Sequence, residues 1–363
     1  MQAAESDRGT ADALQVLSRG TVIPAHPLAL TASRELDVVH QRALTRYYLD
    51  AGAGGLAVGV HITQFRIREH GLYAPLLELT AQEAGDWTSR AVALIAGVTG
   101  PTGQAVQEAR TARALGYTAV IVNVAAFRGL DESEALRHCR LVAREMPIVG
   151  FALAPELGGV HLSYGFWREF AAIDNVLAIK IATFDRYRAL DVIRGVVDAG
   201  AQDRIALYTG NDDNIVADLV TPVTVRGVNG EVTVRFRGGL LGHWSVWTAR
   251  AVELHRQATT PDADQGRTAE LLRLGSRVTD CNSAIFDAHN AFAGCIPGCL
   301  EVLRRQGLVD GAWCLDEDLV MSEGQREEID RVYREHPDLS DDEFVQENLD
   351  RWLTRDTAHA TRP

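Results

Sequence analysis

One lysine, Lys180, occurs among the 36 lysine and arginine residues of the chain. It lies in the apolar run Val176–Ala182, which is typical of a strand buried on both faces. A desolvated ammonium group can lose its proton, whereas a guanidinium group stays charged. A neutral amine attacks carbonyl groups and can form a Schiff base. Coding bias could explain the many arginines but not a cation within an aliphatic strand, so we predict that Lys180 is a catalytic amine.

Eight short apolar runs alternate with amphipathic stretches and would position this amine. Strands are predicted at residues 22–28, 55–60, 93–98, 119–124, 148–153, 176–181, 205–208 and 236–241. Helices are predicted between them at residues 36–51, 80–91, 103–115, 132–145, 164–173 and 186–198. This alternation implies parallel strands covered on both faces, and eight units predict an α/β fold, a closed (β/α)8 TIM barrel. A doubly wound open sheet is the alternative, but no G-x-G-x-x-G follows the first strand.

The barrel is predicted to span residues 20–244. Within it, residues 221–236 hold an Asn-Gly pair between alternating apolar residues, which predicts a hairpin-like insertion before the last strand. From residue 245 to 356 the pattern is helical only. This second part is predicted to be a C-terminal helical subdomain packed on the barrel.

In a (β/α)8 barrel the chemistry lies at the carboxyl ends of the strands. Glycines and small polar residues gather at the predicted strand ends, as a pocket with close backbone approach to a small molecule requires. The candidate substrate-binding residues among them are His61, Thr63, Gly210, Asp212, Asp213 and Gly242.

Each of these candidates also has a purely structural interpretation. Strand-end glycines are what short turns need in any barrel. The Asp212-Asp213 pair could cap the helix that follows it, and His61 could be a hydrogen-bonded core histidine. Lys180 itself could be a structural cation paired with Asp212 or Glu156 in the interior.

Composition excludes several classes of partner. The net charge of −13 argues against nucleic acid or an anionic membrane surface. No apolar stretch approaches the roughly 20 residues that span a bilayer, and the first 19 residues do not resemble a signal peptide. The five cysteines show no C-x-x-C spacing and no histidine pair completes a zinc pattern. We therefore expect a cytoplasmic protein with reduced thiols and no metal.

Several blocks of the chain resemble the dihydrodipicolinate synthase / N-acetylneuraminate lyase family of Schiff-base barrels. LDAGAGGL at residues 49–56 resembles the family's approach to strand two, and AGVTG at 96–100 resembles its strand three. VLAIK at 176–180 is similar to the block that bears the Schiff-base lysine. YTGNDD at 208–213 resembles the lyase block that contacts the polyol part of the substrate, and GGLLG at 238–242 falls where the family has a glycine-rich strand eight. The resemblance covers about residues 20–310.

The chain departs from the family at three blocks. The two threonines and backbone amides that hold the pyruvate carboxylate correspond here to HITQF at residues 61–65, where only Thr63 keeps a hydroxyl. Phe151 occupies the place of the tyrosine that relays protons, and it has no proton to relay. The strand-four aromatic motif reads AAF at residues 125–127. Another base, such as His61, Glu156 or Asp212, would be needed for aldol chemistry.

Two functions follow from the resemblance. The first is a class I lyase or aldolase in which Lys180 forms an imine with a small 2-oxo acid or oxo-sugar acid and needs no other cofactor. The second is a catalytically altered barrel that binds a carbonyl ligand without the usual aldol chemistry. The family resemblance also implies a homodimer or homotetramer, although the altered strand-four motif leaves one family contact open.

Overall fold

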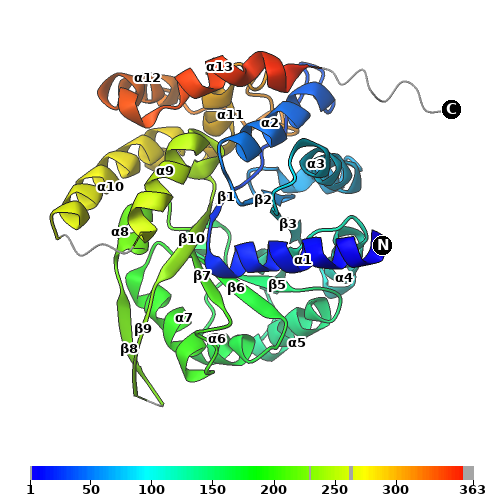
Figure 1. Ribbon diagram of the computed structural model, residues 1–363, viewed down its shortest axis with the longest axis vertical. Helices are drawn as coiled ribbons and strands as arrows, with labels where there is room; N and C mark the ends of the chain where they lie inside the picture. The colour runs from blue at the N-terminus through cyan, green and yellow to red at the C-terminus, as the bar shows by residue number, and fades with distance from the viewer. Residues whose placement is uncertain (1, 229, 261–264, 355–363) are drawn as a thin grey trace.

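The computed structural model describes residues 2–228, 230–260 and 265–354. Eight parallel strands form a ring in the order β1-β10-β7-β6-β5-β4-β3-β2. The ring closes where Ala25 bridges Ala57 in parallel and the His26 N–H donates to the carbonyl of Ala57. The sheet is therefore a closed (β/α)8 barrel, as the alternation of strands and helices predicted (Figure 1). Its strands are β1 Val22–Pro24, β2 Gly55–Val58, β3 Ala93–Val98, β4 Ala119–Val122, β5 Ile148–Leu153, β6 Val176–Ala182, β7 Ala206–Thr209 and β10 Phe236–Leu241.

Helices follow the strands and surround the ring (Figure 1). Asp131 and Glu134 form a reciprocal capping box at the start of α5, and Ser163 and Asp185 cap α6 and α7, so the chain itself marks where these helices begin. The helices of the ring are α2 Val38–Asp50, α3 Tyr73–Trp87, α4 Thr102–Ala114, α5 Glu132–Ala143, α6 Tyr164–Ala171, α7 Arg186–Asp198 and α8 Ile215–Val220.

An N-terminal helix, α1 Gln2–Arg19, lies across the amino-terminal end of the barrel (Figure 1). It contacts β3, β6 and β7, and Leu17 is buried there, with its carbonyl accepting a hydrogen bond from the Tyr208 hydroxyl. The sequence analysis did not predict this helix, because its polar, mixed-charge stretch shows few apolar residues. The helix closes the barrel end opposite to the catalytic end of such folds.

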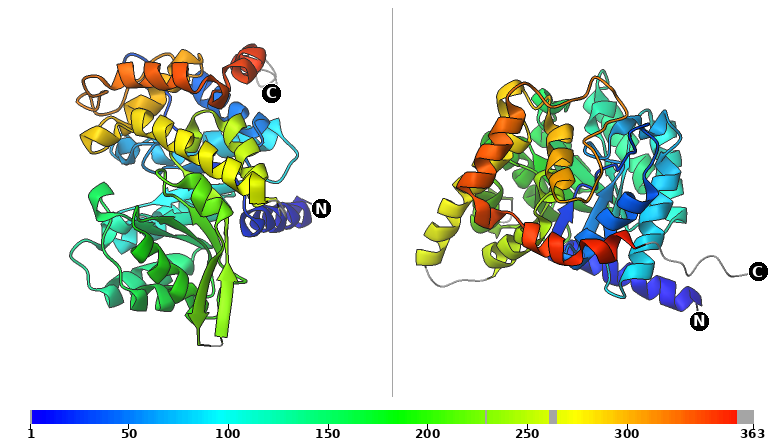
Figure 2. Two further views of the ribbon diagram at one scale, coloured as in Figure 1. Left: turned by 90° about the vertical axis from the view of Figure 1, so that its left-hand side faces the viewer. Right: turned by 90° about the horizontal axis from the view of Figure 1, so that it is seen from above.

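The predicted hairpin is present as the antiparallel pair β8 Val223–Gly227 and β9 Gly230–Val234. Residue 229 of its turn lies outside the described part of the chain. After β10 the chain is helical, in α9 Thr248–Thr259, α10 Gln265–Ile285, α11 Cys295–Arg305, α12 Gln325–Glu335 and α13 Asp342–Leu353. Figure 2 shows these helices gathered on one side of the barrel, where α13 packs on α2 and α10 on α8.

Short 3-10 turns follow β2, β4, β5 and β10, and of these strands β2 and β4 end two residues earlier than predicted. The Asn123 side chain, for example, accepts a hydrogen bond from the Ala125 N–H. It thereby ends β4 at Val122, two residues earlier than expected. Five of the six turns described are η1 Phe65–Arg68, η2 Val124–Phe127, η3 Pro155–Leu157, η4 His243–Ser245 and η5 Ala288–Asn290.

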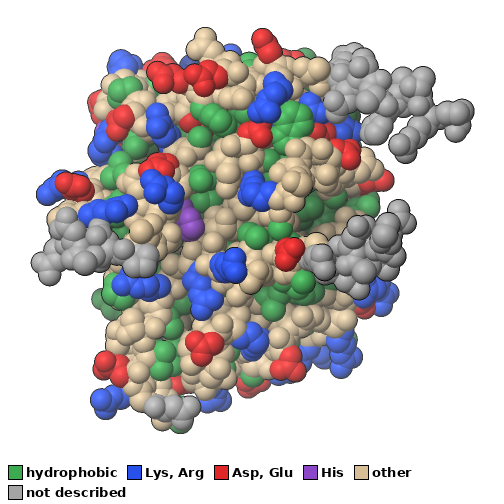
Figure 3. Space-filling model, viewed as in Figure 1, with side chains coloured by type: hydrophobic (Ala, Val, Ile, Leu, Met, Phe, Trp, Pro, Cys, Tyr) green, Lys and Arg blue, Asp and Glu red, His purple; other side chains and the backbone are tan. Residues whose placement is uncertain are grey.

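Acidic and basic side chains are interspersed on the face seen in Figure 3 and form no single basic patch there. Among the described residues, no helix is both long and apolar enough to cross a membrane.

Candidate active site

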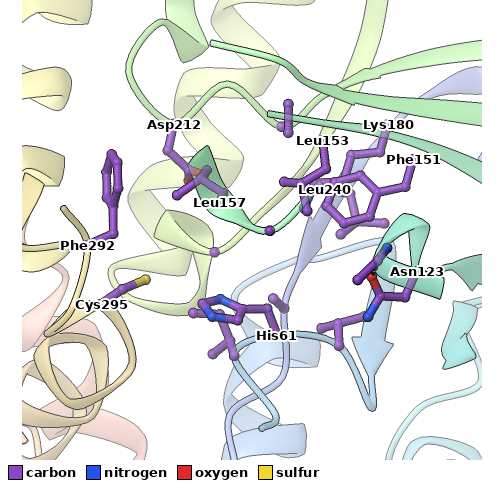
Figure 4. Close-up of a pocket in the computed structure, with 18 of the residues that line it drawn as sticks. His61, Asn123, Phe151, Leu153, Leu157, Lys180, Asp212, Leu240, Phe292 and Cys295 are labelled. Atoms are coloured by element: carbon purple, nitrogen blue, oxygen red, sulfur yellow. Dashed lines mark hydrogen bonds between the residues drawn. The ribbon is translucent and has the colours of Figure 1, made fainter. Parts of the chain in front are cut away.

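A cavity of about 450 Å³ opens at the carboxyl ends of the barrel strands. Every strand of the barrel, or the turn that follows it, contributes to its lining. The segment between α10 and α11 adds Phe286, Ala291, Phe292 and Cys295 from the C-terminal part of the chain. Figure 4 shows that Lys180 and Phe151 lie at one end of this space and Phe292 and Cys295 at the other. A cavity of this size accommodates a ligand larger than a three-carbon oxo acid.

Lys180 projects into the cavity from β6, where β5 places Phe151 directly beside it. The Lys180 Nζ atom lies 4.5 Å from the centre of the Phe151 ring. Among the described residues the amine has no hydrogen-bond or ion-pair partner. Burial lowers the pKa of Lys180 to about 8, and the nearby charge of Asp212 opposes this shift. The predicted apolar surroundings of this amine are thus present, whereas a direct ion pair with Asp212 or Glu156 is not.

Asp212 is a buried carboxyl group that lines the cavity after β7. Its Oδ1 atom accepts a hydrogen bond of 3.0 Å from the His243 N–H. Burial raises the pKa of Asp212 to about 6, and the charge of Lys180 limits this rise. The residue does not cap α8, whose N-cap is Asn214, so the capping interpretation of Asp212 is wrong. Its charge interacts with that of the Lys180 amine, and its raised pKa suits a group that exchanges protons near pH 7.

His61 lies in the turn after β2 and also lines the cavity. Although the side chain is exposed to the cavity, desolvation by the surrounding walls lowers the pKa of His61 to about 4, and the positive charge of Lys180 contributes in the same direction. The imidazole is therefore neutral at pH 7 and can donate or accept a hydrogen bond without carrying charge. Figure 4 shows Lys180, Asp212 and His61 around the same space.

Gly210 and Gly242 both line the cavity, and neither position has room for a side chain. A Cβ atom on Gly210 would lie 2.5 Å from Cε of Lys180. A Cβ atom on Gly242 would lie 2.7 Å from the ring of Phe286. Gly210 therefore makes space for the lysine itself, and Gly242 for the wall contributed by the C-terminal part.

Two of the sequence candidates lie outside the cavity lining. The Thr63 hydroxyl is fully buried, where it donates to the His26 carbonyl and accepts from the Gly59 and Val60 N–H groups. It shapes the turn after β2. Asp213 is half exposed and lies 3.9 Å from the Arg186 guanidinium. The prediction that these two residues bind substrate directly gains no support from their positions.

No tyrosine replaces Phe151 as a proton carrier in this cavity. The Tyr164 hydroxyl donates to Asp198, and the Tyr208 hydroxyl donates to the Leu17 carbonyl. Phe127 of the strand-four block is buried against His138 and Phe166 of the same chain. The aromatic residue of the strand-four block is thus used here for packing.

Sequence reasoning missed the aromatic residues Phe184 and Phe292 and the thiol of Cys295. Phe184 follows β6, and its ring lies 6.0 Å from that of Phe292. The hydrogen bond with the neighbouring Cys299 side chain, together with burial, raises the pKa of Cys295, so the thiol is neutral. The sequence around Phe292 and Cys295 indicates only helices. It does not indicate that this segment lines a cavity formed by barrel strands that are distant in the sequence.

The fold and the cavity define a (β/α)8 barrel that carries a single desolvated lysine at the carboxyl ends of its strands. A model of the Dihydrodipicolinate synthetase family matches residues 20–239, and the chain belongs to this family.

Two curated relatives illustrate the family. N-acetylneuraminate lyase of Citrobacter koseri is 27% identical over 203 residues, which cover 55% of this chain and 65% of the relative. 4-Hydroxy-tetrahydrodipicolinate synthase of Staphylococcus haemolyticus is 27% identical over 146 residues, which cover 39% of this chain and 46% of the relative. In both alignments the chain spans less than two thirds of the relative's length.

Solved structures of the family share the fold. N-acetylneuraminate lyase from Fusobacterium nucleatum, complexed with pyruvate, superimposes with a TM-score of 0.69 at 19% identity, covering 88% of this chain and 98% of that one. A dihydrodipicolinate synthetase homologue from Pseudomonas aeruginosa superimposes with a TM-score of 0.70 at 18% identity, covering 86% and 98%. At these identities the superpositions establish the fold alone.

Proposed function

We propose that this protein is a Schiff-base-forming lyase or aldolase that acts on a small 2-oxo acid or oxo-sugar acid through Lys180. One observation carries the proposal: the only lysine of the chain is a desolvated amine, without an ion-pair partner among the described residues, in the cavity at the carboxyl ends of the barrel strands. With a pKa of about 8, roughly one amine in ten is neutral at pH 7. A neutral amine is what attack on a ketone requires.

The reaction begins with attack of the Lys180 amine on the carbonyl carbon at C2 of the oxo acid. Loss of water gives a protonated imine, which withdraws electrons from the adjacent C3–C4 bond. When that bond breaks, the electron pair moves into the imine as an enamine, and an aldehyde leaves from C4. Protonation of C3 and hydrolysis by water then release pyruvate or its homologue and restore the free amine.

Asp212 is the group we propose to carry the proton in place of the missing tyrosine. Its pKa of about 6 leaves it mostly ionised at pH 7, so it can accept the proton of the C4 hydroxyl as the C3–C4 bond breaks. It can return the same proton to C3 of the enamine. His61 is less suited to this role, because its low pKa makes its imidazole a weak base.

The substrate carboxylate would bind at the turn after β2. The N–H groups of His61 and Ile62, two cavity-lining residues, have no hydrogen-bond partner among the described residues. The buried Thr63 hydroxyl binds the two preceding N–H groups and so holds the turn in this shape. Unpaired backbone N–H groups at a turn are common binding groups for anions.

The alternative is a barrel that forms an imine, or binds a carbonyl ligand, without breaking a carbon–carbon bond. Phe151 favours this alternative, because it removes the usual relay and leaves the amine beside a hydrocarbon ring. Both possibilities predict that the cavity binds a carbonyl ligand, but only the lyase or aldolase would turn it over.

Trapping with borohydride tests the proposal. The protein is incubated with pyruvate, reduced, and weighed intact, and the same is done with Lys180→Met. Since the chain holds one lysine, an adduct formed by the wild type and lost in the variant must lie on Lys180, while the α-amino group remains in both as a background. Equal labelling of the two proteins by every oxo acid tried would contradict the proposal.

A further inference from the structure

Apart from Lys180, Asp212 and His61, the side chains that line the interior of the cavity are mostly apolar. Its walls there are formed by Leu153, Leu157, Phe184, Leu240, Phe286 and Phe292. The Cys295 thiol, a weak hydrogen-bonding group, lies at the same end as Phe292 (Figure 4). A ligand bound to Lys180 would therefore extend from a polar end into a hydrocarbon end.

The remaining polar side chains of the lining are poorly placed to bind the remote end of such a ligand. Arg128 and Glu156 are exposed, and the Arg128 guanidinium donates to the Gly158 carbonyl. The Asn123 side chain lies at the Lys180 end of the cavity (Figure 4), and its carbonyl oxygen accepts from the Ala125 N–H. A sugar chain buried here would leave hydroxyl groups without partners, at a cost of about 1–3 kcal/mol for each unpaired group.

The aromatic residues at this end are held in place by the backbone. Phe184 and Phe292 have φ values of 50° and 66°, in the left-handed region that non-glycine residues rarely adopt. The Phe184 N–H donates to the Asn211 side chain, which is itself fixed by Asp218. The Phe292 N–H donates to the Asp287 carbonyl.

Asp287 also has a left-handed φ of 57°, and its buried carboxylate accepts from the Gly294 N–H and the Ser322 hydroxyl. Two separate polar networks thus direct two aromatic rings toward each other, with centroids 6.0 Å apart. Such strain persists only where the surrounding structure imposes it, which is common at binding sites.

We propose that Phe184 and Phe292 form a specificity site, and that the substrate is a 2-oxo acid with an apolar, preferably aromatic, group at the end remote from its carbonyl. This inference rests on the proposed function. It assigns an apolar group, in place of a polyol chain, to the part of the substrate that occupies this end of the cavity. In the cleavage direction an apolar aldehyde leaves from C4 as the hydroxyl proton passes to Asp212, and that proton returns at C3. The step needs no oxidant, reductant or further reactant.

Competitive trapping distinguishes this substrate class from others. Three 2-oxo acids are compared by the concentration that gives half-maximal borohydride adduct on Lys180: pyruvate, 2-oxo-4-phenylbutanoate and 2-keto-3-deoxygluconate. Burial of a phenyl ring predicts half-maximal trapping of the phenyl acid at a concentration roughly tenfold or more below that of pyruvate. The polyol acid is expected to need at least as much as pyruvate.

Variants locate the effect. Phe292→Ala and, independently, Phe184→Ala should each raise the half-maximal concentration of the phenyl acid about tenfold and leave that of pyruvate unchanged. Tyr187→Ala is the matched control, because this aromatic ring is 83% exposed, outside the cavity. If none of the acids is trapped, the proposed function itself fails. If pyruvate is trapped but the polyol acid binds as well as the phenyl acid, or neither variant discriminates, the specificity site is overturned and the Schiff-base function stands.

Discussion

The two ends of the cavity are built from different parts of the chain and by different physical means. The reactive end comes from barrel strands and the turns after them, and it contains Lys180, Asp212 and His61, whose pKa values are shifted by burial. The opposite end combines the β6–α7 turn with the loop between α10 and α11, and it contains aromatic rings on strained backbone.

This difference implies that the reactive end carries out the chemistry and the aromatic end determines substrate specificity. Strands are rigid elements and can hold an amine beside a carboxyl group within the limits that proton transfer needs. Loops tolerate change and can alter which ligand fits while the strands stay the same. Substitutions at the reactive end should therefore affect every substrate, and substitutions at the aromatic end should affect only substrates that reach it.

The largest effect is expected for Lys180→Met, which should abolish Schiff-base activity with every oxo acid. The same change should stabilise the fold by about 3 kcal/mol at pH 7, because a buried cation is removed. The pKa of Lys180 is lowered from 10.5 to about 8 in the folded state, so the unfolded state binds more protons between these values. The stability of the wild type therefore rises over this range of pH, and the advantage of the variant should shrink from pH 8 to pH 10.5. Urea unfolding at pH 7 and pH 10.5 measures this, and a variant less stable at both would contradict the account.

Asp212→Asn should lower turnover by about 100-fold or more while imine trapping persists. Because the charge of Asp212 raises the pKa of Lys180, its removal should also shift trapping to lower pH. Asp213→Asn, a change at the neighbouring half-exposed carboxylate, is the control and should leave both nearly unaffected. Adding Phe151→Tyr to the Asp212→Asn variant should restore part of the turnover, since it supplies a hydroxyl beside the amine. Equal losses of trapping and turnover in Asp212→Asn would instead assign Asp212 to binding.

Gly210→Ala should reduce the rate of trapping by roughly tenfold without removing the amine, because the new methyl group would press on Lys180 Cε. Gly85→Ala provides the control, since Gly85 lies in α3 with nothing within 4 Å of an added Cβ. The two variants are compared by the initial rate of adduct formation at saturating pyruvate. Full activity of Gly210→Ala would show that the lysine does not depend on this close packing.

The smallest effect on the chemistry is expected for Thr63→Val. The buried hydroxyl serves two N–H groups and one carbonyl, so its loss should destabilise the fold by about 2 kcal/mol. It should also raise the oxo acid concentration needed for trapping several-fold. Thr259→Val, at an exposed hydroxyl that bonds only the His255 carbonyl within its own helix, should change neither quantity appreciably. Thermal unfolding and pyruvate titration provide the two readouts.

The barrel could be predicted from the sequence because each strand is a short apolar run and each helix has a periodic pattern. Lys180 could be found because it is a single cation in one of those runs, and Asp212 because it follows another. The helix α1 could not be predicted, because its stretch of sequence contains few apolar residues. The place of Thr63 outside the cavity lining could not be predicted, because sequence does not reveal whether a hydroxyl faces a ligand or its own backbone.

The aromatic end was beyond prediction for a different reason. Phe292 and Cys295 come from a part of the chain whose pattern indicates only helix, and their approach to Lys180 depends on how that part packs on the barrel. The strained residues Phe184 and Phe292 carry no sequence signal either, since the left-handed region is usually marked by glycine or asparagine.

The pH dependence of adduct formation on Lys180 tests the central claim most directly. The initial rate of reductive trapping with pyruvate and cyanoborohydride is measured from pH 5 to pH 11, with the peptide that contains Lys180 quantified after digestion and Lys180→Met as the background. A desolvated amine predicts a rate that rises through an apparent pKa near 8. A rate that keeps rising toward the ordinary lysine value of 10.5, or no adduct on this peptide at any pH, would contradict it.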